Sequence, residues 1–227
     1  MLRRDYLLRQ IEEFVAVMMR LAGLTKAGHW EDASSVASSQ FKALAGADVT
    51  DLLRMSDTEV VARMAEGDTV FGVQERITMM ARLFKENGDI LKAQGRIQES
   101  RACYSKGLHL LLNSLADDPT SPRPDFLPSI ESFILALNES PLDFETTAML
   151  MRHYELFRDY ARAEDSLFNM VDSQPGNVEL LNFGIDFYQR LLRLDDETLE
   201  LGNLPRAEVN AGLEELNRRR GELITGK

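Results

Sequence analysis

Cysteine, proline and glycine are scarce in this sequence, and each shortage argues against a class of protein. Cys103 is the only cysteine, so no disulfide can form within the chain and no CxxC pair is present for zinc or redox chemistry. A reducing compartment fits this composition, and we expect the protein in the cytoplasm. The 14 glycines and 7 prolines among 227 residues disfavour an all-β fold, which needs many tight turns.

Long apolar runs are also missing. The longest uncharged apolar run, residues 14–19, is far shorter than the roughly 20 residues that a membrane-spanning helix needs. The opening residues 3–7 faintly resemble a twin-arginine export signal, but charged residues interrupt the apolar segment that should follow. We therefore expect neither a membrane span nor export. With 44% hydrophobic residues, the chain can still bury a sizeable core.

Positive charge is in deficit. The 26 Lys and Arg residues stand against 37 Asp and Glu residues, which gives a net charge of −11. An acidic surface repels phosphate backbones, so we expect no nucleic-acid partner. Arg218, Arg219 and Arg220 are a local exception at the predicted end of the last helix, where cations favour the helix carbonyl end. A nucleic-acid regulator that uses these arginines is the weaker alternative.

Enzyme signatures are absent from the sequence. It contains no HExxH, GxSxG, GxxxxGK or GxGxxG motif. The three histidines, His29, His109 and His153, are scattered, and none has a Glu three residues before it. The acidic clusters at 117–118 and 195–197 are typical of solvated loops, since no further oxygen ligands are spaced around them. We therefore predict no catalytic residue, no metal site and no cofactor, and we expect Cys103 to be a buried, inert thiol.

Helical periodicity is what the sequence does contain. Residues 5–25 carry an apolar stripe with steps of three and four, namely Leu7, Ile11, Phe14, Met18 and Leu21. We expect this stripe to pack within the chain. Because it is close to a heptad seam, a homodimer through the N-terminal helix that buries Leu7, Phe14 and Met18 is the alternative.

The remaining pattern predicts an all-α protein of nine to ten helices. Ser56 and Glu59 form a capping-box pair that should start a short helix, and Ser140-Pro141 and Asn177 are further start signals. The other helices are expected near 30–44, 73–94, 97–115, 126–138, 161–173 and from 204–205 to 220. The prolines within 117–125 predict an extended connector between residues 1–116 and residues 126–227.

A repeat is visible in the C-terminal half. Tyr154, Tyr160, Ala163, Leu167 and Pro175 place an aromatic in one helix, a small residue at the helix crossing, a large apolar residue in the second helix and a proline after it. Over residues 144–177, from Phe144 to Asn177, this pattern resembles a tetratricopeptide repeat. Weaker copies are expected around Gly28, Trp30 and Ala33, and around Gly88, Gly95, Ile97, Ser100 and Tyr104. Tyr188 lies 34 residues after Tyr154, and Gly184 fills a small position near it.

The opening helix is also similar to that of a group of uncharacterised bacterial proteins. The tetratricopeptide resemblance implies antiparallel helical hairpins stacked as an irregular right-handed array, whose first helices line a groove. The implied groove positions are Glu145, Ala148, Arg152 and Glu155 in the best copy, and Arg82, Lys85, Asp89 and Lys92 in the middle copy. The middle set is net positive, so an acidic peptide or a carboxylate terminus is a conceivable ligand; a solvated helix face is the alternative.

These observations favour a non-catalytic protein–protein interaction module or scaffold that presents a helical groove to a peptide or protein partner. The alternative is a small-ligand receptor or an enzyme with a pocket between the two helical regions. The ten methionines either fill the core or line a partner surface, since thioether side chains adapt to both settings.

Overall fold

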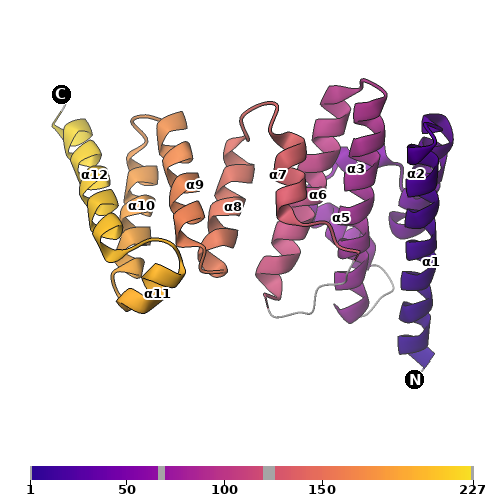
Figure 1. The fold of residues 1–227 in the computed structure, drawn as a ribbon, viewed down its shortest axis with the longest axis horizontal. Helices are drawn as coiled ribbons and strands as arrows, with labels where there is room; N and C mark the ends of the chain where they lie inside the picture. The colour runs from indigo at the N-terminus through magenta and orange to yellow at the C-terminus, as the bar shows by residue number, and fades with distance from the viewer. Residues whose placement is uncertain (1, 66–69, 120–125, 226–227) are drawn as a thin grey trace. The chain divides into compact units, whose positions relative to one another are not determined.

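The computed structural model describes residues 2–65, 70–119 and 126–225, and all of the regular structure in these ranges is helical (Figure 1). This confirms the all-α prediction. The described ranges contain the helices α1 (Leu2–Lys26), α2 (Trp30–Ala45), α3 (Val49–Arg54), α4 (Asp57–Ala65), α5 (Val70–Ala93), α6 (Ile97–Asp117), α7 (Ile130–Leu137), α8 (Phe144–Leu156), α9 (Tyr160–Ser173), α10 (Val178–Leu191), α11 (Asp196–Leu201) and α12 (Arg206–Ile224).

The chain forms two compact units, Met1–Pro141 and Leu142–Lys227. The predicted connector lies largely outside the described residues, which resume at Phe126. Residues 126–141, which we had expected in the second region, fall within the first unit, because α7 packs on α6. Arg101 of α6 holds this segment in place by donating to the Leu137 carbonyl at 2.9 Å and to the Pro141 carbonyl at 2.7 Å.

The first unit is centred on the long antiparallel hairpin of α5 and α6, and α1, α2 and α4 pack on α5. Phe41 of α2 and Phe84 of α5 are fully buried, with ring centroids 4.9 Å apart. Phe14, Met18 and Leu21 of α1 are buried in this unit as well. Most of the apolar stripe of α1 therefore packs within the chain. The Leu7 side chain lies outside the described residues.

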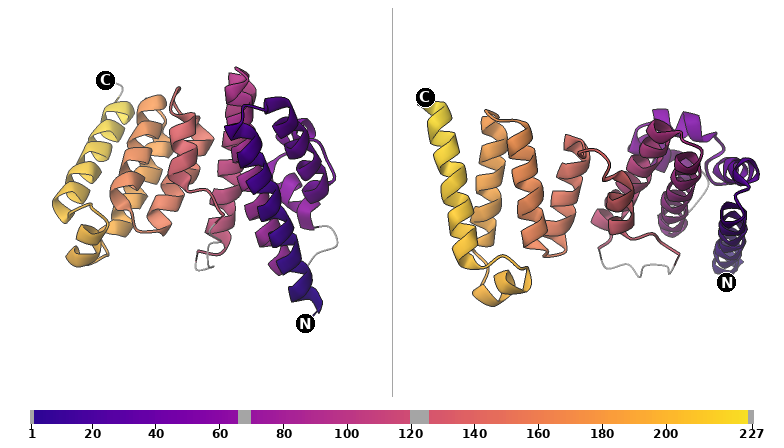
Figure 2. Two further views of the ribbon diagram at one scale, coloured as in Figure 1. Left: turned by 45° about the vertical axis from the view of Figure 1, so that its right-hand side comes forward. Right: turned by 45° about the horizontal axis from the view of Figure 1, so that its top comes forward.

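The second unit contains two helix pairs, α8 with α9 and α10 with α12, which stand side by side in the views of Figures 1 and 2, and the short α11 between α10 and α12 in the chain. The first helices of the two pairs start at Phe144 and Val178, 34 positions apart. Small residues let these helices approach closely. Ala163 is fully buried, and a methyl group on Gly184 would lie only 3.1 Å from Leu167 and 2.5 Å from Leu216.

One turn geometry joins the helices of four hairpins. In each turn a residue has a left-handed backbone, and the next N–H donates to the carbonyl five residues earlier, which is the Schellman arrangement. The left-handed residues are Gly28, Gly95, Arg158 and Asn203, with φ of 75°, 77°, 61° and 56°. The four hydrogen bonds are His29 to Leu24, Arg96 to Leu91 and Asp159 to Tyr154, each 2.9 Å, and Leu204 to Leu199, 3.0 Å. The segments around Gly28 and Gly95 thus have the same turn as the segment around Arg158.

Arg158 occupies a backbone conformation that glycine adopts without strain. We expect Arg158→Gly to raise the free energy of unfolding by about 0.5–1 kcal/mol, because relief of steric strain exceeds the added entropy of the unfolded chain. Gly95→Ala, the matched change in the equivalent turn, should lower it by about 1–2 kcal/mol. Urea unfolding followed by circular dichroism measures both. Destabilisation by Arg158→Gly would contradict the assigned turn.

Helix starts follow the predicted caps in two places and differ in one. The Ser56 N–H donates to Glu59 Oε2 at 2.7 Å, and Asn177 Oδ1 accepts from the Leu180 N–H at 3.1 Å; both confirm the prediction. The predicted start at Ser140-Pro141 is wrong. Asp143 is the N-cap of α8 and accepts from the Thr146 N–H at 2.7 Å, while the carbonyl of Pro141 is bound by Arg101.

The sequence pattern did not predict α3 and α11, which have six residues each. One and a half turns contain too few apolar positions to show a helical period. The acidic cluster at 195–197 starts α11 and is not a loop of solvated charge. Asp195 accepts from the Thr198 N–H at 2.7 Å, and Asp196 pairs with Arg206 of α12. The negative charges therefore serve a helix N-terminus, where they are favourable.

Candidate functional site

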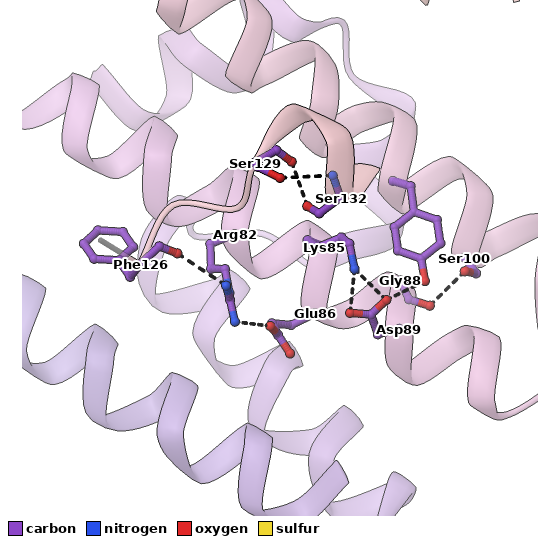
Figure 3. Close-up of polar contacts among 10 residues, drawn as sticks. Arg82, Lys85, Glu86, Gly88, Asp89, Ser100, Phe126, Ser129 and Ser132 are labelled. Atoms are coloured by element: carbon purple, nitrogen blue, oxygen red, sulfur yellow. Dashed lines mark hydrogen bonds and ion pairs between the residues drawn. The ribbon is translucent and has the colours of Figure 1, made fainter. Parts of the chain in front are cut away.

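The four groove positions predicted on α5 follow one another at steps of three and four, and we call them the α5 charged row: Arg82, Lys85, Asp89 and Lys92. Figure 3 shows the first three of them. Asp89 is at the centre of the row. Lys85 Nζ donates to both of its carboxylate oxygens at 2.8 Å, and the Tyr104 hydroxyl of α6 donates to Oδ1 at 2.7 Å. Lys85 Nζ also lies 5.2 Å from the centre of the Tyr104 ring. Burial and the hydrogen bond to Asp89 raise the pKa of Tyr104.

The other two cations of the row are paired as well. Arg82 forms an ion pair with Glu86 and donates to the Phe126 carbonyl at 3.4 Å (Figure 3). Lys92 forms an ion pair with Glu139 at 2.7 Å. The net positive charge that the sequence showed is therefore balanced by Glu86 and Glu139, which lie outside the predicted set. An acidic ligand would have to displace these pairs, so the row is a poor anion site.

Tyr104 also fixes the packing of α5 against α6. Its ring covers Gly88, where a methyl group would overlap the ring carbons. Ser100 Oγ donates to the Gly88 carbonyl at 2.8 Å (Figure 3). Gly88 thus lies at a close helix crossing, as the repeat register predicted. The same register places Ala33 and Ser100 at small positions, and both are buried.

The groove positions predicted on α8 are less engaged with other side chains than those on α5. Glu145 and Arg152 are exposed, and Ala148 is half-buried. Glu155 accepts from Arg190 of α10 through both carboxylate oxygens, at 2.8 and 2.9 Å. This bidentate pair joins the C-terminal ends of α8 and α10, so the first helices of the two pairs are neighbours there.

The exposed side of α10 repeats the exposed side of α8 with a shift of 34 residues. Phe144 and Val178, Glu145 and Glu179, and Arg152 and Asp186 are equivalent positions, all exposed. Phe183 is also exposed, with 45% of its surface accessible. We call this set the α8–α10 face: Phe144, Glu145, Arg152, Val178, Glu179, Phe183 and Asp186. The sequence analysis did not predict the α10 part of this face, although the 34-residue spacing of Tyr154 and Tyr188 relates Glu145 to Glu179 and Arg152 to Asp186.

A half-buried charge cluster lies elsewhere in the first unit. Lys106 of α6 donates to Asp57 Oδ1 at 2.8 Å and to the Met55 carbonyl at 2.7 Å, and His109 Nδ1 lies 3.5 Å from Asp57 Oδ2. These contacts fix α3 and the start of α4 to α6. Burial raises the pKa of Asp57, but the hydrogen bonds from His109 and Lys106 and their positive charges together outweigh it, and the pKa is lowered overall.

The lowered pKa of Asp57 predicts a pH dependence of stability. The folded state favours the carboxylate, so its contribution is present above the pKa of unfolded Asp, about 4, and is lost as the pH falls through the lowered value. We expect Asp57→Asn to destabilise the protein more at pH 7 than at pH 3, as measured by urea unfolding. The exposed Asp51 provides a control, and Asp51→Asn should change the stability at pH 7 by less than about 0.5 kcal/mol. An equal loss for Asp57→Asn at both pH values would refute the assignment.

Cys103 is fully buried, as expected, and accepts a hydrogen bond from the Asn87 amide at 3.3 Å. Burial raises the pKa of the thiol to about 11. The thiolate is therefore scarce at neutral pH, and this site lacks the properties of a nucleophile. Among the described residues, no group of three or more His, Cys, Asp and Glu side chains is placed to hold a metal ion.

Arg218, Arg219 and Arg220 do not end the last helix, because α12 continues to Ile224. Each is engaged within the second unit. Arg218 pairs with Glu215 and Glu222, Arg219 pairs with Glu215 and Asp172, and Arg220 donates to the side chains of Asn182 and Asn217. These contacts account for the arginines without a phosphate ligand.

A pocket of about 530 Å³ lies among α2, α3 and α4 in the first unit. Its wall carries charges of both signs, and Lys42 and Asp48 form an ion pair there at 3.1 Å. The charged lining residues are Lys42, Asp48, Asp51, Arg54, Glu59 and Arg63. Because three residues of each sign line it, the pocket favours no single charge class of small ligand.

None of the helices in the described ranges is apolar over a length that could cross a membrane.

The geometry defines an all-α protein built from antiparallel helix pairs. A family model matches residues 1–221 of the chain and is described as "Family of unknown function (DUF6483)". The chain therefore belongs to this family, which agrees with the resemblance of its opening helix to an uncharacterised group. No curated protein and no solved structure matches the chain.

Proposed function

We propose that this protein is a non-catalytic interaction module whose α8–α10 face binds a segment of a partner protein. One observation carries the proposal: the exposed stripe of α8 recurs on α10, with aromatic and aliphatic side chains left in solvent on both helices. Exposed apolar side chains that are bordered by charged residues are typical of interaction surfaces.

The helix pairs support a tetratricopeptide-like stacking in the second unit. The 34-residue spacing of α8 and α10, the buried Ala163 and the close approach at Gly184 all fit it. In this interpretation Glu145, Arg152 and Glu155 are contact positions, as the resemblance implied. The α5 charged row contributes less, because its cations are already paired within the first unit. The buried lone cysteine fits a role in the cytoplasm.

Co-purification from the native host tests this proposal. The baits are the tagged wild-type chain, a Phe183→Asp variant and a Leu201→Asp variant. Leu201 is a matched control, because it lies on α11 and is 79% exposed. Partners should be retained by wild type and by Leu201→Asp but lost with Phe183→Asp. Recovery of the same proteins with all three baits would refute the proposal.

A further inference from the structure

The partner class follows from the charges on the α8–α10 face, provided that this face is the binding surface proposed above. Glu145, Glu179 and Asp186 are exposed, and within the described residues none of them forms an ion pair or a hydrogen bond with another side chain. Arg152 is the one unpaired cation of the face as defined. Glu155 and Arg190 cancel each other in their bidentate pair.

The α10 half of the face has the strongest pattern. Glu179, Phe183 and Asp186 follow one another at steps of four and three, so they lie along one line of the helix. The opposite side of α10 is committed to the core, where Leu181 and Tyr188 are buried. An exposed aromatic ring is thus flanked along the helix by two carboxylates. The net charge of −11 adds a long-range field that attracts cations.

From this arrangement we propose that the α8–α10 face binds a cationic amphipathic protein segment, rich in lysine or arginine along one edge and in aliphatic or aromatic residues along the other. The apolar edge covers the exposed side chains of Phe183, Phe144 and Val178. The basic edge pairs with Glu179 and Asp186. Burial of the apolar side chains gives affinity, and the carboxylates select against acidic segments.

Isothermal titration with two synthetic peptides tests the charge preference. One peptide has leucine and lysine in helical amphipathic order, and the other has glutamate in place of lysine. The lysine peptide should bind wild type at least about tenfold more tightly than the glutamate peptide, and raised salt should reduce the difference. Equal affinity of the two peptides, or no binding of either, would overturn the inference.

Charge reversal locates the binding site. The variant with Glu179→Lys and Asp186→Lys should lose about tenfold in affinity for the lysine peptide and gain affinity for the glutamate peptide. The matched control carries Glu197→Lys and Glu200→Lys on α11, which change the net charge equally at exposed positions, and it should change the affinity less than about threefold. Equal losses in the two variants would show that only net charge matters and would overturn the inference. The co-purification with Phe183→Asp tests the proposed function independently of the peptide experiments. If that experiment identified an acidic or neutral partner, the proposed function would stand and the cationic partner class would be rejected.

Discussion

Gly88→Ala should destabilise the first unit by about 2–3 kcal/mol, although alanine is the better helix former. The added methyl group would overlap the Tyr104 ring. That ring is buried, and its hydroxyl is held by Asp89 at 2.7 Å, so it cannot move aside without losing a hydrogen bond and packing. Urea unfolding followed by circular dichroism at pH 7 gives the free energy of unfolding.

Gly23→Ala on α1 is the matched control, because a methyl group there meets no other atom within 4 Å. It should stabilise the protein by up to about 1 kcal/mol through helix propensity alone. If Gly88→Ala also stabilised the protein, the close crossing of α5 and α6 at Tyr104 would be wrong.

Phe84→Ala should have the larger effect, a loss of about 3–5 kcal/mol. Phe84 is fully buried against Phe41 and beside Gly107, so truncation leaves a cavity that the helices of the central hairpin cannot close. Thermal unfolding should show a lower midpoint for the transition of the first unit.

Phe183→Ala is the corresponding change on the α8–α10 face, and we expect it to change stability by less than about 0.5 kcal/mol. Its ring is 45% exposed, so little packing is lost. The contrast between two phenylalanines separates residues that hold the fold from residues that are available to a partner. A loss above about 2 kcal/mol for Phe183→Ala would place its ring in the core and contradict the face.

The sequence predicted most helices because their apolar stripes are long and regular. The stripe through Phe14, Met18 and Leu21 is buried, as its spacing predicts. Capping signals worked where the side chain had no competitor, as at Ser56 and Asn177. The start at Ser140 failed because Arg101, far away in sequence, binds the loop carbonyls, and a local pattern contains no such information.

The candidate site was harder to predict than the fold for the same reason. The positions of the α5 charged row follow from the tetratricopeptide resemblance, but its charge is set by Glu86 on the next turn and by Glu139 after α7. The exposure of Phe183 could not be inferred from hydrophobicity, which would place a phenylalanine in the core. The shift of 34 residues does not reveal it either, because the equivalent residue on α8, Met149, is half-buried.

Site-specific photo-crosslinking in living cells is the most direct test of the central claim that the α8–α10 face contacts a partner protein. A photoreactive phenylalanine analogue would replace Phe183 in one strain and the exposed Leu201 in another. The account predicts a discrete adduct of higher mass from position 183 and none of that mass from position 201. The same adduct from both positions, or none from position 183, would contradict it.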